Sequence, residues 1–136
     1  MNRIHEGLAF QNVFAPQSVD ASTDKTTAYV DLSGVDEAVF LISTAALGAG
    51  KSLTVKLMAA SDSSGSDAEE IGSAKFTDEA GTEPQLAVVT YRPTAAHGRY
   101  VAGKFQHEGA AAVICGVPAA ADGLYLPAAN GWSLAV

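Results

Sequence analysis

Residues 26–60 read TTAYVDLSGVDEAVFLISTAALGAGKSLTVKLMAA, and this stretch decides the fold class. It contains three apolar-rich segments of strand length, which are separated only by SGVDE and GAGKS. Neither connection has room for a helical crossover, so the pattern predicts antiparallel strands in a β-meander. The same pattern argues against the α/β scaffolds on which most cofactor chemistry is built.

Short strands are expected along the rest of the chain as well. Residues 27–32 and 52–58 alternate between apolar and polar, whereas residues 38–44 are apolar on both faces and predict a more central strand. Further strands are predicted at 8–14, 71–76, 86–91, 99–106 and 110–117, with Pro16 ending the first of them. The sum is an all-β, single-domain antiparallel β-sandwich or jelly-roll-like barrel of about seven to nine short strands. Jelly-roll and immunoglobulin-like strand orders both fit this count.

The domain organisation follows from the length of 136 residues, which corresponds to one domain. We expect a single β domain over residues 1–136, with an N-terminal strand or arm at 1–25, a β core at 26–118 and a C-terminal segment at 119–136. The last segment carries the chain's one tryptophan, Trp132. It fits either a final edge strand or an arm that docks onto a neighbouring subunit.

Composition excludes several classes of function. The net charge is −7 and the eight Lys and Arg residues are scattered singly, which argues against direct binding of nucleic acid. Only 17% of residues are charged, a composition that suits a surface covered by neighbouring subunits. Cys115 is the single cysteine, so an intrachain disulfide, a Cys-based zinc site and a CxxC pair are excluded. Neither an export signal nor a transmembrane helix is expected.

The loop GAGKS at residues 48–52 resembles part of a phosphate-binding loop. The Walker pattern requires glycine where this chain has Ala45, and a strand follows where a helix would be needed. We therefore predict a tight glycine-rich hairpin connection whose glycines adopt positive φ.

The histidines and acidic residues give weak signals for a site. His5, His97 and His107 lack the close spacing of metal ligands and are expected at the surface or in loops. The acidic loop contains Asp62, Asp67, Glu69 and Glu70, which could offer oxygen ligands to calcium but do not fit the DxDxDG pattern. Cys115 lies in an apolar segment and is expected to behave as a small buried hydrophobe. No residue is assigned as catalytic, cofactor-binding or metal-binding, no cofactor is expected, and we expect the protein not to be an enzyme.

Three blocks of sequence carry a resemblance to a known family: YVDLSGVDEAVFLISTAAL at 29–47, GAGKSLTVKLMAASDSSG at 48–65 and TYRPTAAHGRYVAGKFQHEGAAAVICGV at 90–117. The shared features are a DLSG-x-(D/E)-x-V turn into a buried strand, a G-x-x-LTVKL strand leading to a polar DS-x-G loop, and a later RYV strand paired with an apolar one. Over roughly residues 26–118 the chain resembles small virion proteins encoded beside the major capsid gene in tailed bacteriophages and prophages.

The resemblance implies a capsid decoration, or cement, protein that binds the outside of the phage head and bridges neighbouring capsomers. Its implied partner is the phage major capsid protein, and its implied location is the capsid exterior after synthesis in the host bacterial cytoplasm. A homo-oligomer is implied, with a trimer favoured and a dimer or monomer left open. No residue carries over as a functional site, since the resemblance concerns strands and turns.

Two other functions stay open at this stage. A β-sandwich that binds carbohydrate or the host surface would need exposed aromatic side chains, and the candidates are Tyr91, Tyr100, Tyr125 and Trp132. A head-tail joining or tail component would share the β-rich fold and form closed rings.

Overall fold

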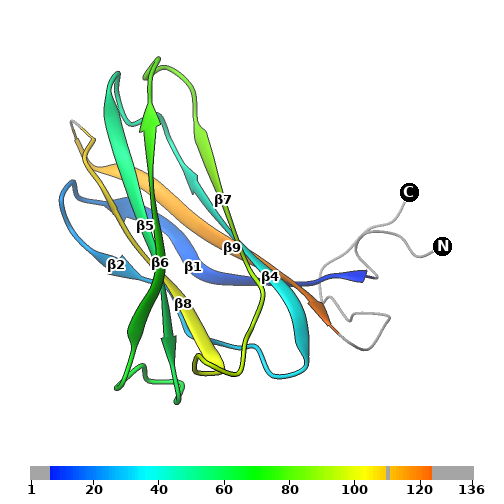
Figure 1. Cartoon of the computed structure of the whole chain (residues 1–136). Helices are drawn as coiled ribbons and strands as arrows, with labels where there is room; N and C mark the ends of the chain where they lie inside the picture. Colours follow the sequence, from blue (N-terminus) through cyan, green and yellow to red (C-terminus); the bar gives the residue numbers. More distant parts are fainter. Residues whose placement is uncertain (1–6, 110, 124–136) are drawn as a thin grey trace.

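Two antiparallel β-sheets face each other across a hydrophobic core in the computed structural model, which describes residues 7–109 and 111–123 (Figure 1). Sheet A has the strand order β1-β9-β4-β7, and sheet B has the order β2-β8-β5-β6 with the short β3 also paired to β8. The predicted all-β sandwich is confirmed. The strands of the described part are β1 (Ala9–Val19), β2 (Lys25–Thr26), β3 (Val30–Asp31), β4 (Val35–Thr44), β5 (Lys51–Ala60), β6 (Glu69–Asp78), β7 (Gln85–Tyr91), β8 (Tyr100–His107) and β9 (Val113–Gly123).

The strand pairing decides between the two orders that the sequence left open. We count β2 and β3 as one interrupted strand, because both pair with β8. The first strand then pairs with the last, the second with the last but one, and so on inward: β1 with β9, β4 with β7, and β5 with β6. A long hairpin rolled up in this way is a jelly roll. The sandwich therefore has the jelly-roll order and not the immunoglobulin-like one.

The β-meander predicted for residues 26–60 is wrong. β4 lies in sheet A whereas β3 and β5 lie in sheet B, so the chain crosses the sandwich twice where the meander would have paired neighbours. The connection at residues 45–50 is long enough to cover the roughly 10 Å between stacked sheets. Gly48 and Gly50 have φ values of 111° and 76°, which confirms the predicted positive φ, but the loop joins two sheets and is not a hairpin.

Alternate strand residues fill the core between the sheets. Phe40 of β4 and Val55 of β5 are almost fully buried, and so is Phe105 of β8, which meets the ring of Phe14 edge-on with 5.1 Å between centroids. Cys115 of β9 is also buried, as predicted, and burial raises the pKa of its thiol. A buried thiol held in its neutral form acts as a small apolar side chain.

Several strands are longer than the sequence pattern suggested, β1, β6 and β9 most of all. β1 continues through Pro16 to Val19, with shifts of register between Asn12 and Phe14 and between Phe14 and Gln17. Proline is tolerated there because β1 is an edge strand, so the expectation that Pro16 ends the strand is wrong. β6 has ten residues where a weak strand at 71–76 was predicted, and β9 extends beyond residue 117 to Gly123. Residues 124–136 of the predicted C-terminal segment lie outside the described residues.

Candidate interaction surface

The centre of the outer face of sheet A is apolar. Four of the five large hydrophobic side chains that are exposed in the described chain lie on it: Phe10 (50% exposed), Leu86 (58%), Val88 (54%) and Ile114 (54%). Cross-strand pairing places them in rows with neutral residues, and no charged residue occurs among the central outward positions of β9, β4 and β7. These positions are Ile114, Gly116, Pro118, Ala120, Val39, Leu41, Ser43, Leu86, Val88 and Thr90.

The outer face of sheet B differs in charge. Lys56 of β5 lies between Lys104 of β8 and Ser73 of β6, and the neighbouring row contains Lys75 of β6. The ammonium of Lys104 is 3.6 Å from a carboxylate oxygen of Asp24. Such charged side chains stay hydrated, so this face suits contact with water. Sheet A presents the face whose burial would remove apolar surface from water.

A shallow groove of about 520 Å³ lies on the outer face of sheet A. Pro16, Ser43, Ile114 and Pro118 are among the residues that line it, together with Gly116. A Cβ atom at Gly116 would lie 3.1 Å from Cγ of Pro16, so a side chain at this position of β9 would press on the Pro16 ring of β1. The groove adds relief to a face that is otherwise flat, which favours shape-specific docking.

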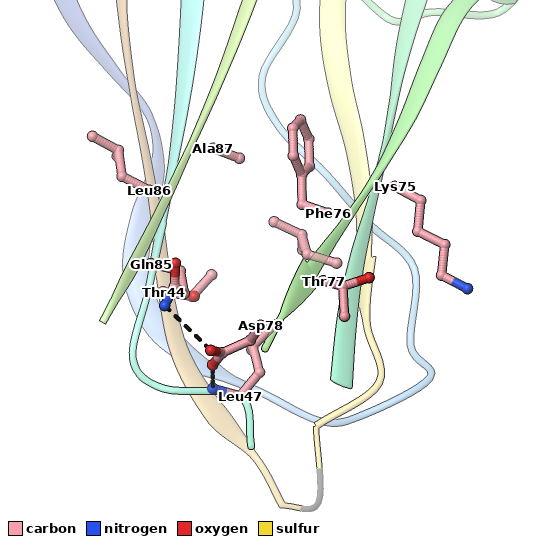
Figure 2. Close-up of a pocket in the computed structure, with 10 residues that line it drawn as sticks. Thr44, Leu47, Lys75, Phe76, Thr77, Asp78, Gln85, Leu86 and Ala87 are labelled. Atoms are coloured by element: carbon pink, nitrogen blue, oxygen red, sulfur yellow. Dashed lines mark hydrogen bonds between the residues drawn. The ribbon is translucent and has the colours of Figure 1, made fainter. Parts of the chain in front are cut away.

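A second hollow, of about 360 Å³, opens between the edge strands β6 and β7 (Figure 2). The buried carboxylate of Asp78 accepts hydrogen bonds from the backbone N–H of Leu47 at 3.0 Å, that of Gly81 at 2.9 Å and Nε2 of Gln85 at 3.3 Å. All three donors belong to the loops that close this end of the sandwich or to the start of β7. Asp78 therefore fastens the loops, and the hollow contains no nucleophile paired with a base among its lining residues.

His107 occupies a position that the sequence did not predict. The prediction of a surface or loop position is wrong for His107, because it is the last residue of β8 and fully buried. Its Nε2 lies 2.6 Å from the carbonyl oxygen of Val19, and its Nδ1 accepts the backbone N–H of Gly109 at 3.0 Å. The ring therefore fastens the end of β1 to the turn after β8. His97 lies in the loop after β7, as predicted, and His5 lies outside the described residues.

The acidic loop binds its own backbone. The carboxylate of Asp62 accepts hydrogen bonds from the hydroxyls of Ser66 and Ser64 and from the N–H groups of Ser64, Gly65 and Ser66. Asp67 does the same for Ser61. Glu69 faces Nδ1 of His97 at 3.4 Å, so the acidic side chains point in different directions and not toward one centre. Within residues 7–109 and 111–123, no three His, Cys, Asp or Glu side chains are grouped to hold a metal ion.

Asp62 is expected to titrate near pH 2. The hydroxyls of Ser66 and then Ser64, followed by backbone N–H groups, lower its pKa from 3.8 to about 2. Because the folded-state pKa is depressed, this contribution to stability is present above about pH 4 and is lost as the pH falls toward 2. Carboxyl NMR titration should find this midpoint in the native chain and a higher one in Ser66→Ala. A midpoint near 3.8 in both chains would contradict the hydrogen bonding described.

The DLSG and RYV motifs meet in space. Arg99, which precedes β8, binds Asp31 of β3 through two nitrogens, with Nε 2.9 Å from Oδ1, and the N–H of Ser33 donates to the same oxygen at 3.0 Å. The guanidinium of Arg99 and the amide of Ser33 lower the pKa of Asp31 well below its usual range. Gly34 completes the turn with a φ of 73°. The motifs that carry the resemblance therefore hold the entry to β4 beside the start of β8.

Two of the four candidate aromatics for carbohydrate binding are described. Tyr91 is half-buried, and its hydroxyl is buried without a hydrogen-bond partner among the described residues. Tyr100 is half-buried with the guanidinium of Arg99 5.2 Å from its ring centroid. Neither ring lies open on a broad face, as stacking on a sugar requires. Tyr125 and Trp132 lie outside the described residues.

Comparison with known proteins identifies the fold. No family model and no curated protein matches the chain. The PBSX exported protein XepA shares the fold at a TM-score of 0.61 and 7% identity, with 100% of this chain and 45% of that one covered. This chain thus spans less than half of XepA. Modules of an endo-1,4-β-D-xylanase from Clostridium thermocellum match at a TM-score of 0.47 and 12% identity, with 84% of this chain and 24% of that one covered. Bacillus endospore appendages match at a TM-score of 0.47 and 14% identity, with 92% of this chain and 98% of that one covered.

The structure also addresses whether the described residues contain a helix that could span a membrane. Within the part of the chain that it describes, there is no helix with the length and hydropathy that a membrane span requires.

Proposed function

We propose that this chain is a structural virion protein that decorates the outside of a tailed-phage head and has no enzymatic activity. Its partner in this proposal is the major capsid protein, and it contacts neither nucleic acid nor membrane. One observation carries the proposal furthest. The central outward positions of sheet A carry no charge and expose Leu86, Val88 and Ile114, with Glu37 and Asp122 only at one end of this face, whereas the outer face of sheet B carries lysines at its centre.

The two faces suit the two environments of a decoration subunit. A subunit on a shell needs one face that gains free energy when it leaves water and another that stays hydrated. Burying apolar surface contributes about 25 cal/mol per Å², and a stable interface buries about 800 Å² on each partner. The apolar rows of sheet A supply the first kind of face and Lys56, Lys75 and Lys104 the second.

Binding would then stabilise the head by mass action. DNA packed inside a head pushes the capsomers apart, and a subunit that binds across their seam must be released before the seam opens. A ligand present at 100 times its dissociation constant adds about 2.7 kcal/mol per site. Summed over many seams, this reinforces a shell without any chemical step.

The fold and the sequence resemblance support the same proposal. Jelly rolls build viral capsid domains as well as lectin domains, so the fold is compatible with a virion role. The resemblance to virion proteins encoded beside the major capsid gene favours the viral role over that of a lectin domain. The turn at Asp31 and its bond to Arg99 give two of the shared motifs a clear structural purpose.

Co-sedimentation with undecorated heads of the corresponding phage tests the proposal. The purified chain should bind saturably, at a fixed ratio of copies to major capsid protein, and the decorated heads should resist heating better than bare heads. That ratio would also indicate which symmetry positions are filled. A folded chain that stays in the supernatant at all concentrations would refute the proposal.

A further inference from the structure

The sandwich has four sheet edges, and three of them are protected against pairing with another strand. β1 contains Pro16 and two shifts of register, β2 and β3 have two residues each, and β6 carries Glu69, Glu70 and Lys75 among its exposed residues. Prolines, bulges, very short strands and charges are the devices by which proteins prevent edge-to-edge association. We therefore expect no further strand to pair with these three edges in solution.

The fourth edge, β7, has none of these devices. Its seven residues are QLAVVTY, without charge or proline, and they pair with β4 in unbroken register from Tyr91 to Gln85. Among the described strands β7 pairs with β4 alone, so its other side is open. The side chain of Leu86 points away from the sandwich while that of Ala87 points into it (Figure 2). An uncharged, regular edge of this kind is a template for an added strand.

The sequence around β7 is complementary to a second copy of itself. Antiparallel pairing centred on Val88, the middle residue of the strand, sets Leu86 opposite Thr90 and Ala87 opposite Val89. Like charges directly opposite each other destabilise a strand pair, and none meet in this register. Glu83 precedes β7 and Arg92 follows it, so each Arg92, which pairs with Glu37 of its own chain at 3.1 Å, comes within one residue of Glu83 of the second copy. Parallel pairing would instead bring like charges together at both ends.

We propose that two copies of this chain associate through β7 about a twofold axis that passes beside Val88. The strand that pairs with the open edge of β7 is thus β7 of the second copy. The two A sheets then become one sheet of eight strands. The outer faces of the two sheets join, which doubles the apolar surface described above. A twofold pair is the dimer that the sequence left open, in place of the trimer favoured by the resemblance. This proposal does not depend on capsid binding.

Charged substitutions at Val88 provide the test, because the twofold axis sets this residue opposite Val88 of the second copy. The native chain should elute at twice its mass of 13.9 kDa in size-exclusion chromatography with light scattering. Val88→Glu and Val88→Lys should each elute as monomers, since each places two like charges face to face. An equimolar mixture of the two variants should recover the dimer, with glutamate opposite lysine. The dimer dissociation constant of each variant alone should rise at least tenfold.

Ile114→Lys is the matched control. It introduces a charge on the same outer face but on β9, and should leave the dimer intact. Circular dichroism should show the same β content for every variant, since Val88 is half exposed. A native chain that remains monomeric at high concentration would overturn the proposal, as would an oligomer that Val88→Glu does not dissociate. A monomer that pairs through β7 only with a strand of the capsid protein would also overturn it.

Discussion

Replacement of His107 by leucine is expected to lower the free energy of unfolding by about 2–6 kcal/mol. The fully buried ring binds the carbonyl of Val19 and the N–H of Gly109, and leucine would leave both groups buried without partners. Each buried unsatisfied group costs about 1–3 kcal/mol. Since domains of this size are stable by about 5–15 kcal/mol, the loss is large, and the melting temperature should fall by roughly 10 °C.

His97→Leu is the control for this measurement. His97 lies in the loop after β7, where it contacts Glu69 at 3.4 Å in an exposed pair and lies 6.5 Å from the ring of Tyr91, so its loss should change stability by about 0.5 kcal/mol or less. Urea unfolding of both variants and the native chain measures the difference. If His107→Leu loses less than about 1 kcal/mol, the ring does not fasten the end of β1 in the way described.

Ile114→Lys is expected to weaken binding to undecorated heads by about tenfold to a hundredfold. Ile114 is 54% exposed, lies near the start of β9 on the candidate interaction surface and borders its groove. A lysine there would have to lose hydration against an apolar contact, and the buried area of the isoleucine would be lost as well. Each factor of ten corresponds to about 1.4 kcal/mol. Co-sedimentation over a range of concentrations gives the two dissociation constants.

Ser73→Lys is the matched control for the docking face. Ser73 is an exposed strand residue on the outer face of sheet B, beside Lys56, so the same charge is added to the opposite side of the sandwich. Its binding should equal that of the native chain. Equal loss in both variants would point to a general effect of charge, and loss in Ser73→Lys alone would assign docking to sheet B.

Local alternation predicted most strands well, because burial of one face imposes period two on the sequence, but the strand predicted at 27–32 is wrong, since only Lys25–Thr26 and Val30–Asp31 are paired there and Thr27 is buried while Ala28 is exposed. The predictions at 38–44, 52–58, 86–91 and 99–106 each fall within three residues of the bounds of β4, β5, β7 and β8. The same alternation, extended one step beyond Phe105, would have placed His107 in the core. The signal was present, and it was missed because histidine is usually exposed.

The pairing of strands could not be predicted in the same way. Alternation shows which residues of a strand face inward but not which strand lies beside it, and residues 45–50 are as suitable for crossing a sandwich as for turning within a sheet. The contrast in charge between the outer faces of the two sheets could not be predicted from the sequence either. Leu86 and Val88 belong to β7 and Ile114 to β9, and they form one surface only because β9, β4 and β7 are adjacent.

A reconstruction of phage heads after addition of the purified chain tests the central claim most directly. The account predicts added density on the outside of the shell in which the outer face of sheet A, with Leu41, Val88 and Ile114, contacts the major capsid protein. Lys56 and Lys104 should face away from the shell. Density that places sheet B against the shell, or a shell without added density at saturating concentration, would contradict it.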